Sequence, residues 1–291
     1  MSDQPMPASS AHAPALPAEP PRRRLPRLPL PGLLGLAVIL FWLATAIAGP
    51  WLLAPEANAP GADVVFGRLS AAHPLGTDYL GRDMLARLVL GAGYTVGVAI
   101  VATLLASAGG TALALLAAVR GGWADGTLSR LMDTLISIPS KLFALIMVAA
   151  FGSSVTLLAL TAALIYVPGV FRIARSLAVN INAMDYVAVA RSRGEGDLYI
   201  MRHEILPNML GPMLADLGLR FVYVVLLLAG LSFLGLGVQP PEADWGSLVR
   251  ENLGGLPEGA PAVIVPALAI ASLTIAVNLV IDNLPGRANR E

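Results

Sequence analysis

The stretch LVLGAGYTVGVAIVATLLASAGGTALALLAAV, residues 88–119, contains no charged side chain. About 20 apolar residues in an α-helix are enough to cross the ~30 Å hydrocarbon core of a bilayer. The stretch therefore predicts a membrane-spanning helix that extends past the membrane. A membrane β-barrel would instead show alternating segments of about 10 residues, and the sequence shows none.

Similar apolar runs recur on both sides of this stretch. Of the 291 residues, 56% are hydrophobic and only 13% are charged, whereas a soluble domain has about 25% charged residues. We therefore predict an all-α, polytopic membrane protein with about six transmembrane helices. The predicted spans are residues 32–54, 88–119, 128–151, 154–175, 212–236 and 262–284.

The composition argues against several kinds of site. The formal net charge is zero, which gives no sign of a nucleic-acid partner. The chain has no cysteine, so disulfides and thiolate metal sites are excluded. His12, His73 and His203 lie far apart, and no cluster has metal-ligand spacing. We predict neither a bound metal nor a resident cofactor.

The N-terminal residues 1–31 are rich in Pro, Ala and Ser and end in the basic stretch PRRRLPRLPLP, residues 21–31. We predict a disordered cytoplasmic tail here. A signal peptide is the alternative, because basic residues precede an apolar stretch. The apolar run Leu33–Leu53 is long for the core of a signal peptide, which favours a retained first span.

Basic residues are distributed unevenly between the two sides of the membrane. If the N-terminus is inside, most of the 19 Lys and Arg residues fall in inside segments. The outside segments hold only Arg68, Arg82, Arg87 and Arg250. Because Lys and Arg concentrate in cytoplasmic loops, we predict that both termini, including residues 286–291, are cytoplasmic. The long segments 55–87 and 237–261 are then extracytoplasmic and could form a lid or a docking rim.

The cytoplasmic connection between the fourth and fifth spans, about residues 176–211, contains the polar insert RSRGEGDLYIMRHEILPN, residues 191–208. Most connections have about 4–6 residues, so a long one with helical patterning is more typical of a docking element than of an ordinary solvated loop. Asp185 and Asp197 are the expected N-caps of two short helices. Gly194 and Gly196 are expected to break the chain between them, because glycine tolerates a positive φ.

The second of these short helices is predicted to be amphipathic. Leu198, Met201 and Ile205 share one face at helical spacing. Pro207 is expected to end the helix, because the residue before a proline disfavours the α conformation. The insert would then form a knob on the cytoplasmic side.

The triplet AVA at 188–190, Gly194 and the run Ile205, Leu206 and Pro207 are similar in spacing to the EAA loop, the cytoplasmic coupling loop of ABC importer permeases. Further segments resemble the inner-membrane permeases of dipeptide, oligopeptide and nickel importers, and the likeness covers about residues 68–285. These segments are HPLGTDYLGRDMLARLVLGA (73–92), GGWADGTLSRLMDTLISIPS (121–140) and LSFLGLGVQPPEADWG (231–246).

The resemblance implies the type I ABC importer permease fold in a bacterial inner membrane, with the permease core over residues 88–285. Such a permease pairs with a second, related permease, and two cytoplasmic ATPase subunits that bind ATP and Mg dock on the coupling loops. A substrate-binding protein delivers the cargo from outside, and the permease itself is not catalytic. The residues implied in ATPase coupling are Asp185, Tyr186, Val187, Ala188, Ala190, Gly194, Leu198, Met201, Ile205, Leu206 and Pro207.

Two features of the sequence bear on this resemblance. Ala188 stands where the family pattern has Glu, which removes an expected capping box with Asp185 and a polar contact to the ATPase. Lys141 is the only lysine and follows Ser140, so a G-x-x-x-x-G-K-[ST] phosphate loop is impossible. If ATP drives transport, another chain supplies the ATPase.

Lys141, Pro139 and Pro168 are candidate pore or gate residues. An intramembrane cation is a functional hypothesis by default, and Lys141 could meet an anionic group such as a peptide carboxylate. The favoured alternative is that Lys141 snorkels to the interface or pairs with Asp133 or a neighbouring subunit. The two prolines predict kinks in pore-lining helices or bends fixed by packing.

Two further pairs of residues are candidate contacts. Asp216 and Arg220 are four positions apart and predict a structural ion pair on one helix face. Asp244 and Trp245, within the outer segment, are a possible contact for the binding protein. Trp245 is alternatively an interfacial anchor.

Other functions make different demands on the sequence. A self-sufficient secondary transporter often has internal repeats and intramembrane acids, but this chain shows no clear repeat and few acids in its spans. An intramembrane serine protease needs Ser and His at membrane depth, and none of the three histidines lies there. Di- or oligopeptides are the expected cargo, with nickel or another small solute as the alternative.

Overall fold

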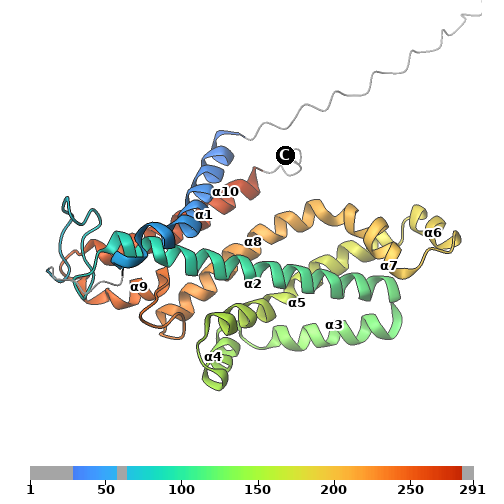
Figure 1. Ribbon diagram of the computed structural model, residues 1–291. Helices are drawn as coiled ribbons and strands as arrows, with labels where there is room; N and C mark the ends of the chain where they lie inside the picture. The colour runs from blue at the N-terminus through green and yellow to red at the C-terminus, as the bar shows by residue number, and fades with distance from the viewer. Residues whose placement is uncertain (1–28, 58–63, 284–291) are drawn as a thin grey trace, which may run out of the picture.

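The computed structural model describes residues 29–57 and 64–283, which form a bundle of helices with no β-strand in those ranges (Figure 1). The all-α prediction is confirmed. Most of the predicted tail and all of residues 286–291 lie outside the described residues. The elements are α1 (Leu30–Ala57), α2 (Met84–Arg120), α3 (Gly122–Ser137), α4 (Ser140–Phe151), α5 (Val155–Asn182), α6 (Asp185–Ser192), α7 (Asp197–Tyr199), the π-helical turn η1 (Ile200–Ile205), α8 (Leu206–Phe233), α9 (Trp245–Glu251), the 3-10 turn η2 (Leu253–Gly255) and α10 (Pro261–Asp282).

Five of the predicted spans correspond to long apolar helices. By length and composition, α1, α2, α5, α8 with the turns before it, and α10 can each cross a membrane. Several of them are longer than expected: α2 begins at Met84, inside the segment expected to be extracytoplasmic, and α5 continues to Asn182. The connection before α8 is therefore mostly helical.

The predicted third span, residues 128–151, is not one helix. It is broken into α3 and α4, which are bent by 86° relative to each other. Pro139 causes the break, because the residue before a proline is pushed out of the α region, and Ile138 has φ −85° and ψ 122°. The two helices count as a sixth span only if the bent pair is taken as one.

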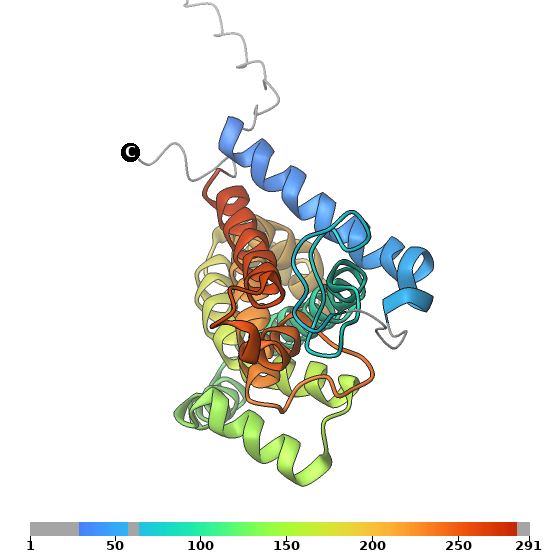
Figure 2. The same ribbon diagram turned by 90° about the vertical axis from the view of Figure 1, so that its left-hand side faces the viewer.

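The long helices define an elongated molecule with two different ends. Helices α2, α5 and α8 run along its length, and α3 lies alongside them (Figure 1). The knob of α6, α7 and η1 lies at one end, and α9 with the loop from residue 64 lies at the other. Seen from the α9 end, α1 lies at the periphery of the bundle, next to α2 and α10 (Figure 2).

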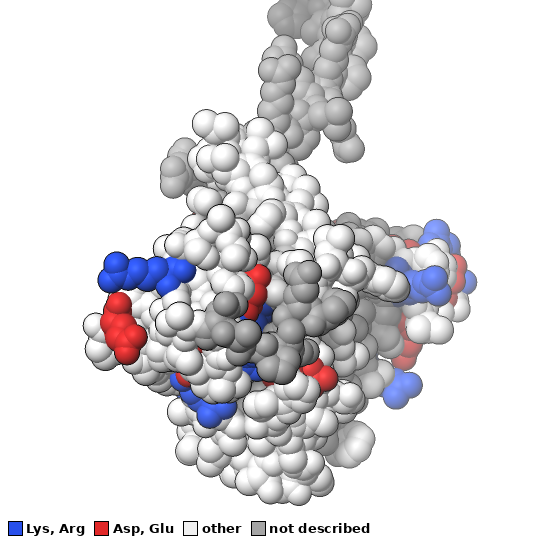
Figure 3. Space-filling view, turned by 60° about the vertical axis from the view of Figure 1, so that its left-hand side comes forward, with Lys and Arg blue, Asp and Glu red and all other residues white. Residues whose placement is uncertain are grey.

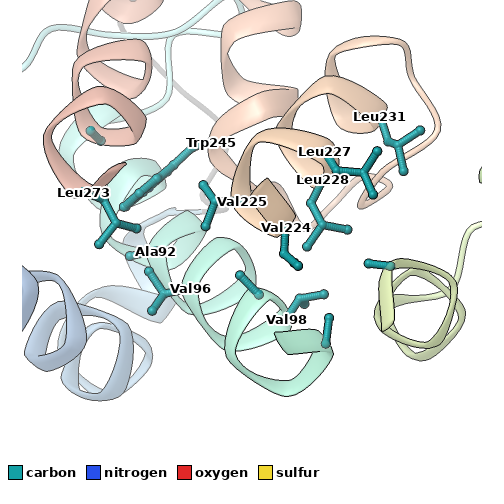
Figure 4. Packing of buried hydrophobic residues seen from close by; sticks show 14 of the residues in the cluster. Ala92, Val96, Val98, Val224, Val225, Leu227, Leu228, Leu231, Trp245 and Leu273 are labelled. Atoms are coloured by element: carbon teal, nitrogen blue, oxygen red, sulfur yellow. The ribbon is translucent and has the colours of Figure 1, made fainter. Parts of the chain in front are cut away.

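A tryptophan pair anchors the core at the α9 end. Trp245 is 0% exposed, and its indole N–H donates to the carbonyl of Leu88 at 3.0 Å. Its ring meets that of Trp42 edge-on, with 4.6 Å between the centroids, and Trp42 donates in turn to Ser272 Oγ at 2.9 Å. Figure 4 shows Trp245 beside Leu273, among apolar side chains of α2 and α8. The pair thus joins α1, α2, α9 and α10.

Buried charges hold the loop before α2 against α9. Arg87 Nη2 donates to Glu251 Oε2 at 2.7 Å, and Arg82 Nε donates to Asp78 Oδ2 at 2.7 Å. Two longer ion pairs connect the loop to the helices: Arg82 Nη2 lies 3.8 Å from Glu251 Oε2, and Arg87 Nε lies 3.7 Å from Asp78 Oδ2. Burial raises the pKa of Glu251, and the nearby positive charges of Arg87 and Arg82 oppose that rise. Because a buried charge left without its partner is strongly destabilising, this network fixes the loop on the end of the bundle.

The outer surface of the bundle is largely uncharged. In Figure 3 uncharged atoms cover most of the visible face, and the charged side chains gather in separate groups. Many large apolar side chains on the long helices are exposed, including Phe41, Leu104 and Leu268. Such a surface suits contact with lipid or with other membrane subunits.

Candidate functional site

The knob, residues 184–205, is built on a helix that ends in a glycine. Gly194 has φ +85°, a conformation that favours glycine. Its N–H donates to the carbonyl of Arg191 at 2.9 Å, and the N–H of Glu195 donates to the carbonyl of Ala190 at 3.3 Å. This pair of bonds is a Schellman motif. The predicted turn at Gly194 is confirmed, and it fixes the angle between α6 and the following helix.

The predicted caps of the two short helices are wrong. Met184 is the N-cap of α6 and Gly196 is the N-cap of α7, and neither cap makes a side-chain hydrogen bond. Asp185 and Asp197 are instead the first residues of their helices, where a negative charge still favours the helix dipole. Ala188 is then one residue too far along α6 to complete a capping box. A Glu at position 188 would therefore not complete a capping box either, so its replacement by Ala removes none.

The second short helix does not stop at Pro207. It continues through η1 into α8, with the N–H of Leu206 donating to the carbonyl of Met201. Pro207 lies in the first turn of α8, where a missing N–H breaks no helical bond of α8. The wider π-helical turn connects the knob to the long helix without an interruption.

The buried face of the knob differs from the predicted one. Ile205 is fully buried as expected. Ile200 is also fully buried, whereas Leu198 is 76% exposed. The π-helical turn changes the number of residues per turn, so the spacing of an ordinary α-helix misplaces Leu198. On α6, Val187 and Ala190 face inward. These side chains pack in one cluster with Val119 of α2, Met132 of α3, Ala178 of α5 and Met209 of α8.

Polar contacts attach the knob to the bundle. Arg191 Nη2 donates to Asn182 Oδ1 at 2.9 Å, and Asn182 Nδ2 donates to the carbonyl of Ala118 at 3.1 Å. Asn208 Nδ2 donates to Tyr186 Oη at 3.2 Å and so joins α8 to α6. These bonds link α6 to α2, α5 and α8.

The outer surface of the knob carries exposed apolar side chains as well as the exposed charged residues Asp185, Arg191 and Arg193. Met184, Tyr186, Val189 and Leu198 are exposed, and Val189 is 57% exposed. Ala188 is also exposed, so the residue that departs from the family pattern lies on this outer face. An exposed apolar patch supported by a buried core is typical of a protein-docking surface. We call these five apolar residues the docking face.

The candidate pore residues lie around the break between α3 and α4. Pro139 forms the break, and Lys141 is the second residue of α4. Lys141 is exposed and makes no ion pair with any described residue. The predicted alternative of a Lys141–Asp133 pair is wrong, since Asp133 accepts from Arg172 Nη2 at 2.9 Å. Pro168 is buried inside α5, which continues through it without a break.

A cavity of about 240 Å³ opens at this break, and the three predicted pore residues are not among the residues that line it. Its walls include Ile138, Ser140, Tyr166, Gly169 and Arg220. The predicted ion pair of Asp216 and Arg220 is confirmed, with 3.2 Å between Asp216 Oδ2 and Arg220 Nε. The guanidinium also borders the cavity, which the sequence did not indicate.

The predicted binding-protein contact at Asp244 and Trp245 is wrong, because both side chains are buried. Asp244 caps α9 and accepts from the N–H of Ser247 at 2.7 Å, while Ser247 Oγ accepts from the N–H of Asp244 at 2.9 Å. Burial raises the pKa of Asp244, and its hydrogen bonds with Ser232 and Ser247 oppose that rise. Asp244 and Trp245 therefore stabilise the core at the α9 end.

No three His, Asp or Glu side chains come together as a metal site would need, within residues 29–57 and 64–283. The exposed apolar side chains of the knob are instead typical of a surface that docks another protein.

Comparison with known proteins gives one family and several relatives. The family model for the inner membrane component of binding-protein-dependent transport systems matches residues 110–290. The dipeptide transport system permease protein of Haemophilus influenzae is 34% identical over 213 residues, 73% of this chain and 72% of that protein. The di/tripeptide permease protein of Pseudomonas aeruginosa is 32% identical over 261 residues, 88% of this chain and 85% of that protein. The glutathione permease protein of Pectobacterium atrosepticum is 34% identical over 215 residues, 74% and 71% of the two chains.

Proposed function

Since this chain belongs to the family of inner membrane components of binding-protein-dependent transport systems, we propose that it forms half of the translocation pore of an ATP-driven peptide importer. A second, homologous permease forms the other half. Two cytoplasmic ABC ATPase subunits bind ATP and Mg and drive the cycle, and a substrate-binding protein delivers di- or oligopeptides from outside. The chain itself carries no catalytic site in this proposal.

The main support for this proposal is that the knob has one exposed face and one face buried against the bundle. Its docking face is exposed, while the opposite face, with Val187 and Ile205, is buried in a cluster that reaches α2, α3, α5 and α8. Protein interiors are close-packed and transmit displacement rather than absorbing it. A partner that moves α6 therefore moves the ends of these helices.

The polarity of the molecule follows from this role. The knob end is cytoplasmic, where the ATPase subunits are, and the α9 end is extracytoplasmic, where the binding protein docks. Both chain termini are cytoplasmic in this arrangement. The excess of arginine in the segments at the knob end supports it.

The docking face also determines how the ATPase is held. At position 188 this chain presents a methyl group instead of a carboxylate, so the contact is mainly apolar. Tyr186, Val189 and Leu198 supply most of that surface. Tyrosine and exposed aliphatic side chains are suitable anchors for a pocket on a partner.

The substrate class is inferred from the relatives. They are named as permeases for dipeptides, for di- and tripeptides and for glutathione, which supports a peptide cargo. The same architecture importing nickel or another small solute is the second candidate. A secondary transporter is a weaker one, because the chain offers few acidic side chains in its spans for ion coupling.

The experiment is purification of the tagged chain in mild detergent, followed by identification of the co-purifying subunits by mass. The purified assembly is then placed in liposomes with its binding protein and a labelled dipeptide. We expect a second permease and ATPase subunits, and uptake that needs ATP hydrolysis. Uptake by the chain alone, without ATP, would overturn the proposal, and uptake of nickel but not peptides would change the cargo.

A further inference from the structure

The cavity at the break between α3 and α4 has one charged residue in its lining, Arg220, although the cavity lies within membrane-spanning segments. Arg220 lies about 20 Å from the Phe233 end of α8, and Gly169 lies about 20 Å from the neighbouring Val155 end of α5, at about 1.5 Å per residue. Arg220 and Gly169 line the same cavity. Charged residues at such depth usually mark a pathway for a substrate or ion.

The guanidinium of Arg220 pairs with Asp216 and lies against Gly169, which lines the same cavity. Its Nε donates to Asp216 Oδ2 at 3.2 Å, which leaves the two terminal nitrogens for other partners. A Cβ at position 169 would come within 2.5 Å of Nη1 and 3.1 Å of Nη2. Only a glycine on α5 allows the terminal nitrogens to lie where they do. The terminal nitrogens therefore lie against α5 at Gly169, beside the cavity that both residues line.

A helix N-terminus contributes to the same cavity. Helix α4 begins at Ser140, which lines the cavity, and its cap residue Pro139 provides no side-chain hydrogen bond. Free N–H groups and the dipole at a helix N-terminus favour negative charge. Lys141, the next residue, adds a positive charge near this terminus. Asp216 is the acidic partner of Arg220, and it accepts from Nε of that residue.

A break in a helix at membrane depth is tolerated where the backbone lines a cavity or is covered by protein. The break at Ile138 lines this cavity. Its other walls include apolar residues such as Phe143 and Leu164, and the phenol of Tyr166 donates to the carbonyl of Tyr223 at 2.9 Å. The cavity thus combines an apolar wall with one cationic corner, a combination suited to a small amphiphilic anion.

We propose that Arg220 and the N-terminus of α4 form a transient binding site in the pore for a carboxylate of the transported substrate. This inference rests on the proposed function, and it adds a specificity-determining residue to it. The arginine fork suits a carboxylate because it donates two parallel hydrogen bonds. The two sources of such a group are the C-terminus of a peptide and an acidic side chain.

The first test uses the assembled importer in liposomes with its binding protein at saturation. Uptake of a dipeptide with a free C-terminus is compared with uptake of its amide, for the wild type and for Arg220→Gln. Because the binding protein is unchanged, its own preference cancels when the two ratios are compared. We expect the ratio of acid to amide uptake to fall roughly 10- to 100-fold, as expected when hydrogen bonds to a charged group are lost. An amidated dipeptide with a glutamate side chain distinguishes the two carboxylate sources.

Control variants separate this role from a structural one. Arg172→Gln removes an exposed arginine from α5 and should leave the ratio unchanged. Arg220→Lys keeps the charge but loses the fork, and should give an intermediate ratio. Equal loss of acid and amide uptake in Arg220→Gln, or an unchanged ratio, would overturn the inference. Failure of ATP-dependent uptake in the wild type would count against the proposed function instead.

A second measurement needs neither the binding protein nor transport. The chain has no cysteine, so Leu164→Cys places a single thiol of this chain in the cavity wall. Its labelling by a neutral maleimide in the purified complex is followed by mass, with N-acetylalanine or its amide added. We expect protection by the acid only, and loss of that protection in Arg220→Gln or in Gly169→Ala, which displaces the guanidinium. Equal effects of acid and amide would overturn the inference.

Discussion

Gly194 offers the sharpest test of the knob. Its φ of +85° strains any residue with a Cβ, but the space around it is open, because no atom lies within 4 Å of an added Cβ. Gly196 has the same open surroundings with φ −77°. Gly194→Ser therefore introduces backbone strain without a steric clash, and Gly196→Ser is the matched control. Serine is also a favourable residue at the cap position of Gly196.

The expected magnitude follows from the left-handed conformation. That conformation costs a residue other than glycine about 1–2 kcal/mol, so opening of the turn should become roughly 5- to 30-fold easier. The amides of Gly194 and Glu195 donate the two bonds that close the turn. Hydrogen exchange at Glu195 should therefore accelerate by that factor in Gly194→Ser and stay unchanged in Gly196→Ser. Asparagine, which tolerates this conformation, should cost less than serine at position 194.

The same variants report on coupling. We expect Gly194→Ser to lower the amount of substrate transported per ATP hydrolysed, since the docking face of a mispositioned α6 no longer moves the bundle fully. Equal exchange rates in the two serine variants would refute the structural reasoning. Faster exchange in Gly194→Ser with an unchanged transport-to-hydrolysis ratio would instead refute the role of the turn in coupling.

Three further predictions concern the two ends of the molecule. Trp245→Ala should lower the free energy of unfolding by about 3–5 kcal/mol. Trp245→Phe, which loses mainly the hydrogen bond to Leu88, should lower it by about 1–3 kcal/mol. Thermal unfolding in detergent measures both variants, and equal losses would contradict the packing role. Because burial raises the pKa of Asp244, the folded state holds a proton at pH values where the unfolded state has lost it. The wild type should therefore lose stability relative to Asp244→Asn as the pH rises above the ordinary carboxyl pKa of about 4; a constant difference in unfolding midpoint would contradict this. Val189→Asp should weaken co-purification of the ATPase while leaving the unfolding midpoint unchanged. Val187→Ala, in the buried face, should lower the free energy of unfolding by about 2 kcal/mol. A shifted midpoint in Val189→Asp would show that its loss of binding is not a surface effect.

Local sequence predicted most of the helices but not their exact junctions. The apolar runs gave five of the six spans because a membrane helix must satisfy its own backbone and present apolar side chains. Pro139 predicts a kink, yet whether a proline bends or breaks a helix also depends on the packing around it. Pro207 predicts the end of a helix, but the π-helical turn before it allows the chain to continue.

The sequence alone determined the class of the protein, the turn at Gly194 and the absence of a phosphate loop in the chain, because these depend on composition, on one backbone conformation and on residue types. The burial of Trp245 and Asp244, the exposure of Leu198 and the cavity lined by Arg220 were decided by tertiary structure. Each depends on which side chains from distant segments face one another, as when Gly169 of α5 admits the guanidinium of α8. Such contacts are set by packing between helices, which periodicity along one helix does not specify.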